Sequence, residues 1–463
     1  MMASVYVKTF VQMCNYLQDP RQVARFQRLC GIKGTFPDKS TKANRGGLEP
    51  ECPGLRRRIQ PGGVGGEGGE GEGSDRSVGN GAAADATVLQ VNGCQSDDDV
   101  RPGGPPSSSS SSSSAAAAAT DFDTTRAKPL RKNSLTGDVG QEFLIRNRLL
   151  FYLFTFGTEL GNEMFFIIFF PFLFWNIDAL VSRRLIVVWA WNLFVGQSTK
   201  DMVRWSRPAS PPVVKVEVFY NSEYSMPSTH AMTGTAIPFC LFMLTYGRWQ
   251  YSFLFGFCVA LSWSVLVCVS RVYMGMHSVL EVITGFLYSL LILAFFQPML
   301  DKIDNFYMMD HYAPLAIIVS HVSLGLVAFS LDSWSTSRGD TAQALGTGAG
   351  AALASHVNHQ LGLMLDPPPS SLPLILPAIS AGLVLRSLLR FLIGVAVILV
   401  MRMVMKAVTI PFLCRLFGLP SNNVRRARQY MRVELPYRYI VYSVVGFSCV
   451  CFVPLLFRIL NLA

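Results

Sequence analysis

The sequence predicts an all-α fold: a multi-spanning transmembrane helix bundle with a disordered N-terminal tail. Half of the 463 residues are hydrophobic and only 15% are charged, whereas soluble globular proteins carry about a quarter charged residues. The mean hydropathy is +0.33. Because membrane-spanning chains are helices or closed barrels, and the apolar runs here are too long for barrel strands, only a helical architecture fits.

The first part of the chain, residues 1–140, is predicted to be largely disordered. It contains a Gly/Glu tract at 62–73, a serine run at 107–114 and an alanine run at 115–119. Such a composition buries too little apolar surface to offset the entropy of the chain. Within this tail, residues 1–30 could form one or two amphipathic helices on a membrane surface.

A basic segment ends the tail and places Arg131 and Lys132 just before Ser134. This arrangement resembles a substrate for a basophilic kinase, so a kinase acting on Ser134 is a possible partner. An ordinary basic juxtamembrane segment is the simpler interpretation.

The second part, residues 141–463, is predicted to be a polytopic membrane domain with a core at 142–297 and additional helices at 314–463. A helix needs about 20 residues to cross the hydrocarbon layer. The plausible crossings are 149–175, 185–199, 231–246, 250–270, 278–297, 314–331, 342–363, 373–405, which could hold two, and 439–460. This gives eight to ten crossings. The Gly- and Ala-rich run at 342–363 predicts close packing between helices.

Charge and cysteine usage exclude other classes of protein. The sequence pI is about 9.2, but the basic residues lie between apolar runs, where membrane topology explains them better than nucleic-acid binding. The ten cysteines have neither a disulfide framework nor the paired spacing of a zinc site, so they support no disulfide or metal site. No cofactor is expected.

Three polar clusters adjoin the apolar runs, at 200–208, 226–230 and 270–281. Polar groups at membrane depth are costly and therefore suggest a function. Two predicted crossings separate the second cluster from the third, and such a hairpin returns the chain to the same face. Since the first two clusters share one loop, all three are expected on one side of the membrane.

The clusters combine groups that bind an anion. Lys200, Arg207 and Arg271 supply three cations, and a guanidinium can bind phosphate oxygens through two hydrogen bonds. Ser228 and the amide of Thr229 lie at a predicted helix start, where free N–H groups favour an anion. Each cation alone would be interpreted as an interfacial anchor, so only the combination predicts a phosphate site.

Two of the six histidines, His230 and His277, belong to the same clusters. Glu281 follows His277 by four residues and so shares its helix face. A carboxylate there can accept a hydrogen bond from one imidazole nitrogen and leave the other as a nucleophile. A lone histidine at a helix end is usually a cap, but two histidines beside three cations suit phosphoryl transfer.

Two other polar pairs have weaker interpretations. Glu159 and Glu163 are four residues apart at the edge of the first apolar run. They could sense lipid, although packing against a polar neighbour is the simpler interpretation. His356 and His359 lack a carboxylate or thiol within one turn and read as a polar helix face.

The three spaced patterns Lys-x6-Arg-Pro, Pro-Ser-x-His and Ser-Arg-x5-His-x3-acid resemble the signatures of the type 2 phosphatidic acid phosphatase superfamily. Within it, the stretches 270–277, 334–341 and 434–439 resemble the sphingosine-1-phosphate phosphatase family, and its first isoform more than its second.

The resemblance implies a metal-independent phosphatase in which His277 attacks phosphorus and becomes a phosphohistidine. His230 protonates the leaving alkoxide and later activates water, while Glu281 orients His277. The phosphate oxygens are bound by Lys200, Arg207, Ser228, Thr229 and Arg271. The orienting acid is usually Asp in the superfamily, whereas Glu281 in this sequence has one extra methylene, which would shift His277 or require a different rotamer.

The implied substrate is sphingosine-1-phosphate or a related sphingoid-base phosphate. A site at the membrane edge suits an amphiphile, but the residues alone do not separate this substrate from lysophosphatidate or a polyprenyl phosphate. A non-catalytic membrane scaffold that binds lipid phosphate is the alternative of a different class.

The resemblance also implies the endoplasmic reticulum membrane with a lumenal active site. The positive-inside rule places the basic stretch 402–438, and with it the tail, on the cytosolic side. These assignments agree only if an odd number of crossings precedes Lys200, whereas two apolar runs precede it. Otherwise, the tail lies on the other side.

Overall fold

The structure is a computed structural model that describes residues 2–34, 143–217, 223–331, 337–364, 366–419 and 430–462. All of these residues belong to one compact unit of the chain. The Gly/Glu, serine and alanine tracts of the tail and Ser134 lie outside the described residues.

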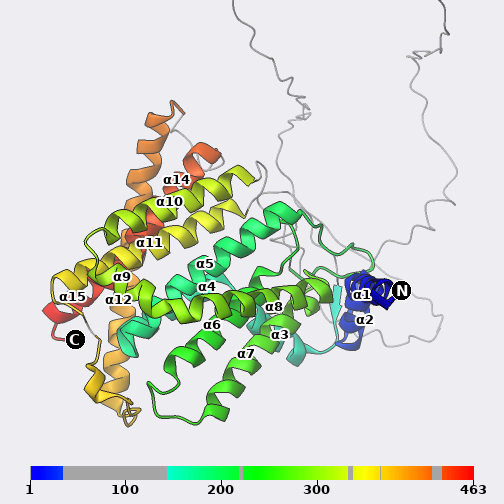
Figure 1. The fold of residues 1–463 in the computed structure, drawn as a ribbon, viewed down its shortest axis with the longest axis horizontal. Helices are drawn as coiled ribbons and strands as arrows, with labels where there is room; N and C mark the ends of the chain where they lie inside the picture. The colour runs from blue at the N-terminus through cyan, green and yellow to red at the C-terminus, as the bar shows by residue number, and fades with distance from the viewer. Residues whose placement is uncertain are drawn as a thin grey trace, which may run out of the picture. The chain divides into compact units, whose positions relative to one another are not determined.

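Helices dominate the described chain, as the composition predicted (Figure 1). In chain order the elements are α1 (Met2–Gln18), α2 (Pro20–Leu29), β1 (Ile32–Gly34), β2 (Phe143–Ile145), α3 (Arg148–Glu159), α4 (Glu163–Asn176), α5 (Ala179–Val203), α6 (Thr229–Thr245), α7 (Phe253–Tyr273), α8 (Val279–Phe296), the 3-10 turn Gln297–Met299, α9 (Leu300–Met309), α10 (Ala313–Leu331), α11 (Arg338–Gln360), the 3-10 turn Pro369–Ser371, α12 (Ala381–Leu416), α14 (Met431–Phe447), the π-helical segment Ser448–Phe452 and α15 (Val453–Ile459). The two short strands pair antiparallel.

Every predicted crossing coincides with a helix, but fewer helices than expected are long and apolar enough to span. Among the described residues six candidate spans qualify by length and composition, or seven if the bent pair α3 and α4 forms one span. The eight to ten crossings expected from sequence exceed this number of candidate spans. Besides the bent pair, two predicted crossings fall outside the six: α6 has 17 residues, and α11 opens with charged residues and is rich in Gly and Ala.

The predicted run 149–175 is not one continuous helix. Its two halves, α3 and α4, meet at an angle of 65°. The break occurs because the Asn162 side chain accepts a hydrogen bond from the Met164 amide at 3.3 Å and so starts a new helix. The run 373–405, which could have held two crossings, contributes only one helix: from Ala381 onward it belongs to the single 36-residue helix α12.

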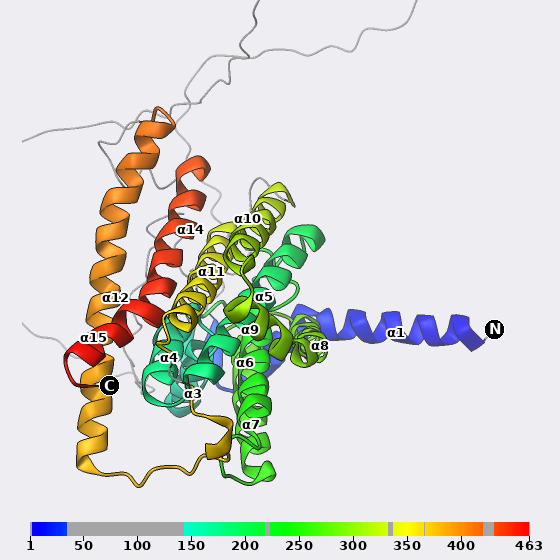
Figure 2. The ribbon, with the colours of Figure 1, turned by 60° about the vertical axis from the view of Figure 1, so that its left-hand side comes forward.

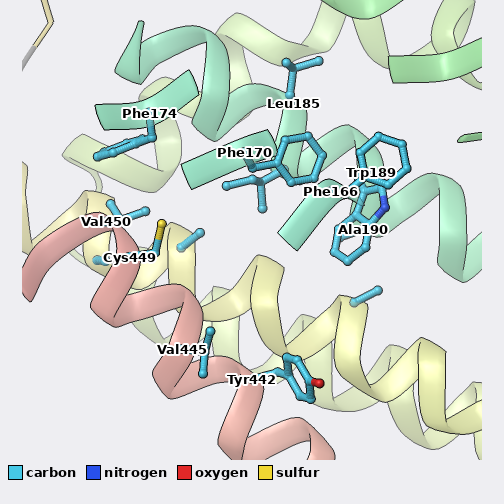
Figure 3. Close-up of a cluster of buried hydrophobic side chains, with 14 of the residues drawn as sticks. Phe166, Phe170, Phe174, Leu185, Trp189, Ala190, Tyr442, Val445, Cys449 and Val450 are labelled. Atoms are coloured by element: carbon cyan, nitrogen blue, oxygen red, sulfur yellow. The ribbon is translucent and has the colours of Figure 1, made fainter. Parts of the chain in front are cut away.

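Apolar side chains of α4, α5 and α14 form the main core (Figure 3). Phe166 and Phe170 stack with ring centroids 5.4 Å apart, and Phe170 meets Trp189 edge to face at 5.7 Å. Such aromatic pairs contribute about 0.5–1.5 kcal/mol beyond the burial of their surface. This core lies directly beneath the polar groups described below.

Helices α11 and α14 lie side by side (Figures 1 and 2) and approach closely through small residues. A Cβ at Gly346 would lie 2.5 Å from the carbonyl oxygen of Tyr439, and one at Gly446 would lie 2.6 Å from that of Thr347. Larger side chains would therefore separate the helices. The close packing predicted for 342–363 is confirmed.

The N-terminal helices pack on the loops that carry the polar clusters. Gln27 of α2 donates to the carbonyls of Val214 at 2.6 Å and Tyr273 at 2.9 Å, and it accepts from the Val214 amide at 3.0 Å. Gly275 nearby has φ +71°, and a Cβ there would collide with the Val214 carbonyl. Helix α1 extends away from the other helices in Figure 2.

Candidate active site

The three polar clusters meet at one end of the helices. The first cluster ends α5, the second starts α6, and the third joins α7 to α8. Three hydrogen bonds connect them pairwise: Lys200 Nζ to Thr229 Oγ1 at 3.0 Å, Ser228 N to Glu281 O at 3.3 Å, and Arg207 Nη1 to Met276 O at 3.1 Å. The expectation that all three lie on one face is confirmed.

Two helix starts shape the site. Ser228 caps α6, since its hydroxyl accepts from the Ala231 amide at 3.4 Å. Ser278 caps α8 in a capping box with Glu281, in which each side chain binds the other residue's amide. The first amides of both helices therefore point toward the site and favour an anion.

His277 is held by a carboxylate and a hydroxyl. Its Nδ1 lies 3.1 Å from Glu281 Oε2 and 3.2 Å from Ser225 Oγ. The same carboxylate oxygen accepts from the Ser278 amide at 3.0 Å and from the Ser225 hydroxyl. Because an ionised carboxylate only accepts, Nδ1 donates its hydrogen to Glu281. Nε2 then keeps its lone pair.

The longer acid therefore does not displace the histidine. Glu281 reaches Nδ1 while it also closes the capping box of α8. Ser225 was missed by sequence analysis, although it lies only three residues before Ser228. An isolated serine in a loop gives no signal until the fold places it against His277.

The electrostatics keep His277 neutral. Its side chain is 1% exposed. Burial lowers the pKa of His277 well below its ordinary value, and the neighbouring cations, Arg207 first, lower that pKa further. His230 acts in the same direction. A neutral imidazole at neutral pH is the form that can act as a nucleophile.

The three predicted cations are buried and lie against two acids that sequence analysis did not single out. Glu223 Oε2 lies 3.6 Å from Lys200 Nζ and 3.5 Å from Arg207 Nη2. Glu217 Oε2 lies 2.7 Å from Arg271 Nη1. The contacts to Glu223 exceed the usual 2.7–2.9 Å of a charge-assisted hydrogen bond. Lys200 and Arg207 are therefore only loosely paired.

Arg271 has spare binding capacity. It is 1% exposed, and its Nε has no hydrogen-bond partner within the part of the chain that the structure describes. A buried donor without a partner is costly. The Nε of Arg271 is therefore suited to bind an anionic oxygen.

A cavity of about 100 Å³ opens beside His230. Its lining residues come from the turn between α3 and α4, from α4, α5, α6 and α11, and from the loop before α6: Gly161, Asn162, Glu163, Phe166, Trp189, Leu193, Gln197, Glu223, Thr229, His230, Thr233 and Asp340. Thr229 belongs to this lining and also binds Lys200. The cavity thus lies next to Lys200, which contacts two of its lining residues, Thr229 and Glu223.

The structure brings together all eight residues predicted for the site. Arg204, in the first polar cluster, caps the end of α5 with φ 53° and donates to the Leu331 carbonyl at 3.1 Å. The described residues contain no group of three or more His, Cys, Asp or Glu arranged to hold a metal ion.

Comparison with known proteins defines the class of protein first. The family model of the PAP2 superfamily matches residues 164–303, a range that contains all three polar clusters. No solved structure matches the chain significantly.

Curated relatives define the family. The chain is 49% identical over 451 residues to sphingosine-1-phosphate phosphatase 1 of Rattus norvegicus, covering 96% of this chain and 97% of the relative. It is 47% identical over 457 residues to the Mus musculus protein of the same name, covering 97% and 98%. Identity to sphingosine-1-phosphate phosphatase 2 of Homo sapiens is 32% over 458 residues, covering 97% and 99%. The chain belongs to the sphingosine-1-phosphate phosphatase family.

Proposed function

We propose that this chain hydrolyses sphingosine-1-phosphate and related sphingoid-base phosphates to the free base and phosphate, through a phosphohistidine intermediate and without a metal. The observation that carries the proposal is the pairing of His277 Nδ1 with Glu281 beside three buried cations. This arrangement aims an imidazole lone pair at an anion-binding site.

Binding begins when the substrate phosphate replaces the acids on the cations. Arg271 and Arg207 bind phosphate oxygens, and Lys200 adds a third positive charge. The Ser228 hydroxyl and the Thr229 amide complete the cradle at the start of α6. Glu217 and Glu223 lie on the loop between α5 and α6, so displacing them requires movement of side chains, not of helices.

In the first chemical step, Nε2 of His277 attacks phosphorus and the bond from phosphorus to the alcohol oxygen breaks. His230 gives its proton to the leaving alkoxide, so that a neutral alcohol departs. Glu281 accepts the Nδ1 hydrogen bond and stabilises the positive imidazole that forms. The cations neutralise the charge on the transferred group.

In the second step, His230 takes a proton from water and the resulting hydroxide attacks the phosphohistidine. The bond between phosphorus and Nε2 breaks, which regenerates neutral His277 and releases phosphate. Over the cycle His230 thus gives one proton to the alcohol and regains one from water, while His277 keeps its Nδ1 hydrogen.

The substrate class follows from the names of the relatives and from the position of the site. Sphingosine-1-phosphate phosphatases 1 and 2 match nearly the whole chain. The site lies where apolar helices end, which allows a phosphate to enter the cation cluster while its hydrocarbon chain stays in the bilayer. Lysophosphatidate and polyprenyl phosphates are the competing substrates.

The proposed location is the endoplasmic reticulum membrane with a lumenal site. The structure bears on one part of this question: Gln27 contacts Val214 and Tyr273, so the N-terminal helices lie on the same face as the site. Of the two alternatives from sequence, this favours a tail that shares the face of the site. Arg438, the last residue of the basic stretch 402–438, contacts Asp340, which lines the cavity. The positive-inside rule places this stretch on the cytosolic side, which argues against a lumenal site.

A tag inserted at residue 215 in sealed microsomes would decide the orientation. Protection of the tag from added protease supports the lumenal site, and cleavage without detergent contradicts it. A second tag at residue 2 should behave identically, because α2 packs on the loops of the site.

Purified protein assayed in EDTA tests the function itself. Sphingosine-1-phosphate should be turned over faster than lysophosphatidate, glucose-6-phosphate and dolichyl pyrophosphate, with no loss of rate in the chelator. Equal turnover of all four would contradict the substrate assignment. Loss of turnover in EDTA would contradict the metal-free mechanism, and phosphate-lipid binding without turnover would favour the scaffold.

A further inference from the structure

The cavity beside His230 has a wall that the phosphatase chemistry does not use. Glu163 begins α4 and Asp340 lies in the first turn of α11. Gln343 donates to Glu163 Oε2 at 3.1 Å, and Arg438 Nη1 lies 3.3 Å from Asp340 Oδ1. These contacts join the first apolar run to the stretches around 334–341 and 434–439, which lie outside the three superfamily signatures.

Two buried side chains in the same cavity carry polar atoms without a partner. Gln197 is 3% exposed and Trp189 is 2% exposed. Neither Gln197 Oε1 nor Trp189 Nε1 has a hydrogen-bond partner among the described residues. Buried polar atoms are almost always bonded. A lone acceptor and a lone donor lining one cavity therefore point to a ligand that carries a matching polar group.

The charge of the lining selects the sign of that ligand. The lining includes three carboxylates, from Glu163, Glu223 and Asp340, and no Lys or Arg within the residues that the structure describes. Arg438 approaches from outside the lining and also pairs with Glu434 at 2.8 Å. A second phosphate would be repelled here, whereas an ammonium group would be attracted.

Resting on the proposed function, we propose that this wall is the headgroup subsite: Glu163 and Asp340 bind the protonated 2-amino group of a sphingoid phosphate. The neighbouring 3-hydroxyl donates to Gln197 Oε1 and accepts from Trp189 Nε1. A sphingoid phosphate is a vicinal amino alcohol, so it supplies one cation and one hydroxyl on adjacent carbons.

The short separation between the phosphate and the amino group of a sphingoid phosphate agrees with the position of the cavity. The amino group is on the carbon next to the one that bears the ester oxygen. His230, which protonates that oxygen, and Thr229, which binds Lys200, both line the cavity. A phosphate bound by the cations therefore places the amine a few bonds away, within the carboxylate-lined space.

Helix electrostatics offer a structural explanation for the two acids, since acids in a first turn are stabilised by the helix dipole. That explanation accounts for each acid separately. It does not account for their opening onto one cavity together with the unpartnered oxygen of Gln197.

The test compares sphingosine-1-phosphate with its 2-deamino analogue, which has the same chain and phosphate. Glu163→Gln and Asp340→Asn should each lower kcat/KM for sphingosine-1-phosphate about tenfold or more, as expected for a lost charge-assisted hydrogen bond. For the 2-deamino analogue, kcat/KM of the same two variants should stay within about twofold of that of the unmodified protein. Gln197→Met should lower kcat/KM by a smaller factor, and only for a substrate that carries the 3-hydroxyl.

Glu159→Gln is the matched control, because Glu159 is exposed, bonds to Asn162 and does not line the cavity. For both substrates, kcat/KM of Glu159→Gln should stay within about twofold of that of the unmodified protein. The ratio of the two kcat/KM values does not depend on the folded fraction, so partial misfolding does not obscure the result. If one acid variant fails to fold, the other acid variant and Gln197→Met decide.

Equal losses on both substrates, or no loss on either, would overturn the headgroup subsite and leave the proposed function standing. Failure of the unmodified protein to hydrolyse sphingosine-1-phosphate, with turnover of the analogue intact, would instead overturn the proposed function.

Discussion

The two ends of α5 both carry buried charges, and they pair these charges differently. At the start of the helix, Arg183 binds both oxygens of Asp304 at 2.8 and 3.0 Å and one oxygen of Asp366 at 2.7 Å. At the other end, Lys200 lies 3.6 Å from a Glu223 oxygen that it shares with Arg207. The first end is saturated with hydrogen bonds, and the second is not.

This difference separates charges that stabilise the fold from charges that bind a ligand. The 25 residues of α5 span about 37 Å, so the two ends lie on opposite sides of the apolar layer. The paired end, to which Asp178, Arg248 and Trp249 also contribute, fixes the helix ends. The loosely paired end keeps its cations available for an anion.

The largest expected effect is on the histidines of the loosely paired end. His277→Ala should lower kcat by on the order of a thousandfold or more, because no other group attacks phosphorus. His230→Ala should lower it by about a hundredfold or more, as a lost general acid does. Steady-state turnover of sphingosine-1-phosphate measures both.

His356→Gln is the control for these variants, because His356 binds the Tyr307 carbonyl at 3.0 Å away from the cluster. Its rate should stay within about twofold. Near-normal turnover by His277→Ala would refute the assignment of the nucleophile.

The comparison is tested by the same substitution in each group of charges: at Arg183 of α5, and at Arg271, which lies in the last turn of α7 and belongs to the cation cluster of Lys200. Arg271→Gln should lower kcat/KM about a hundredfold with little loss of thermal stability, because Arg271 is incompletely bonded. Arg183→Gln should remove the three charge-assisted hydrogen bonds of Arg183 to Asp304 and Asp366 and cost about 3 kcal/mol or more. The activity of its folded fraction should be unchanged.

Melting temperature in detergent and kcat/KM, measured on both variants, separate the two effects. A large loss of stability in Arg271→Gln with no selective loss of kcat/KM would remove the distinction between the two ends.

A smaller effect is expected from the groups that orient His277. Glu281→Gln should lower kcat by about a hundredfold, because the neutral amide no longer stabilises the charged imidazole. Ser225→Ala should lower kcat by up to about tenfold, the value of one neutral hydrogen bond. Neither should change KM much. A change confined to KM would place both residues in substrate binding instead.

The smallest effect on activity should come from the N-terminal helices. Gln27→Met removes three hydrogen bonds to the loops of the site and should cost about 1–3 kcal/mol of stability. Turnover should fall less than tenfold. Gln22→Met in the same helix is the control, and its melting temperature should equal that of the unmodified protein. Equal melting temperatures of Gln27→Met and Gln22→Met would show that the three hydrogen bonds of Gln27 do not stabilise the protein.

The fold class and the predicted site residues could be read from the sequence because both have local signals. Apolar runs of about 20 residues define helices, and the spacing of Lys200, His230 and His277 with two helices between the last two fixes their common face. The break at Asn162 was not predicted, since a capping side chain inside an apolar run is a weak signal beside the surrounding phenylalanines.

The partners of the site residues could not be predicted, because they depend on long-range packing. Ser225, Glu217 and Glu223 lie in a loop whose sequence has no periodicity. Glu163 was noticed in the sequence, but Asp340, which lies 177 positions later in the chain, joins it only through the packing of α11 against the other helices.

Trapping of the phosphoenzyme tests the central claim most directly. Protein mixed with sphingosine-1-phosphate labelled on phosphorus and quenched in alkali should retain label that is stable in base, is lost in acid, and maps to the peptide containing His277. His277→Ala should retain none, while His230→Ala should form the labelled species slowly. Label on a serine, or label retained by His277→Ala, would contradict the account.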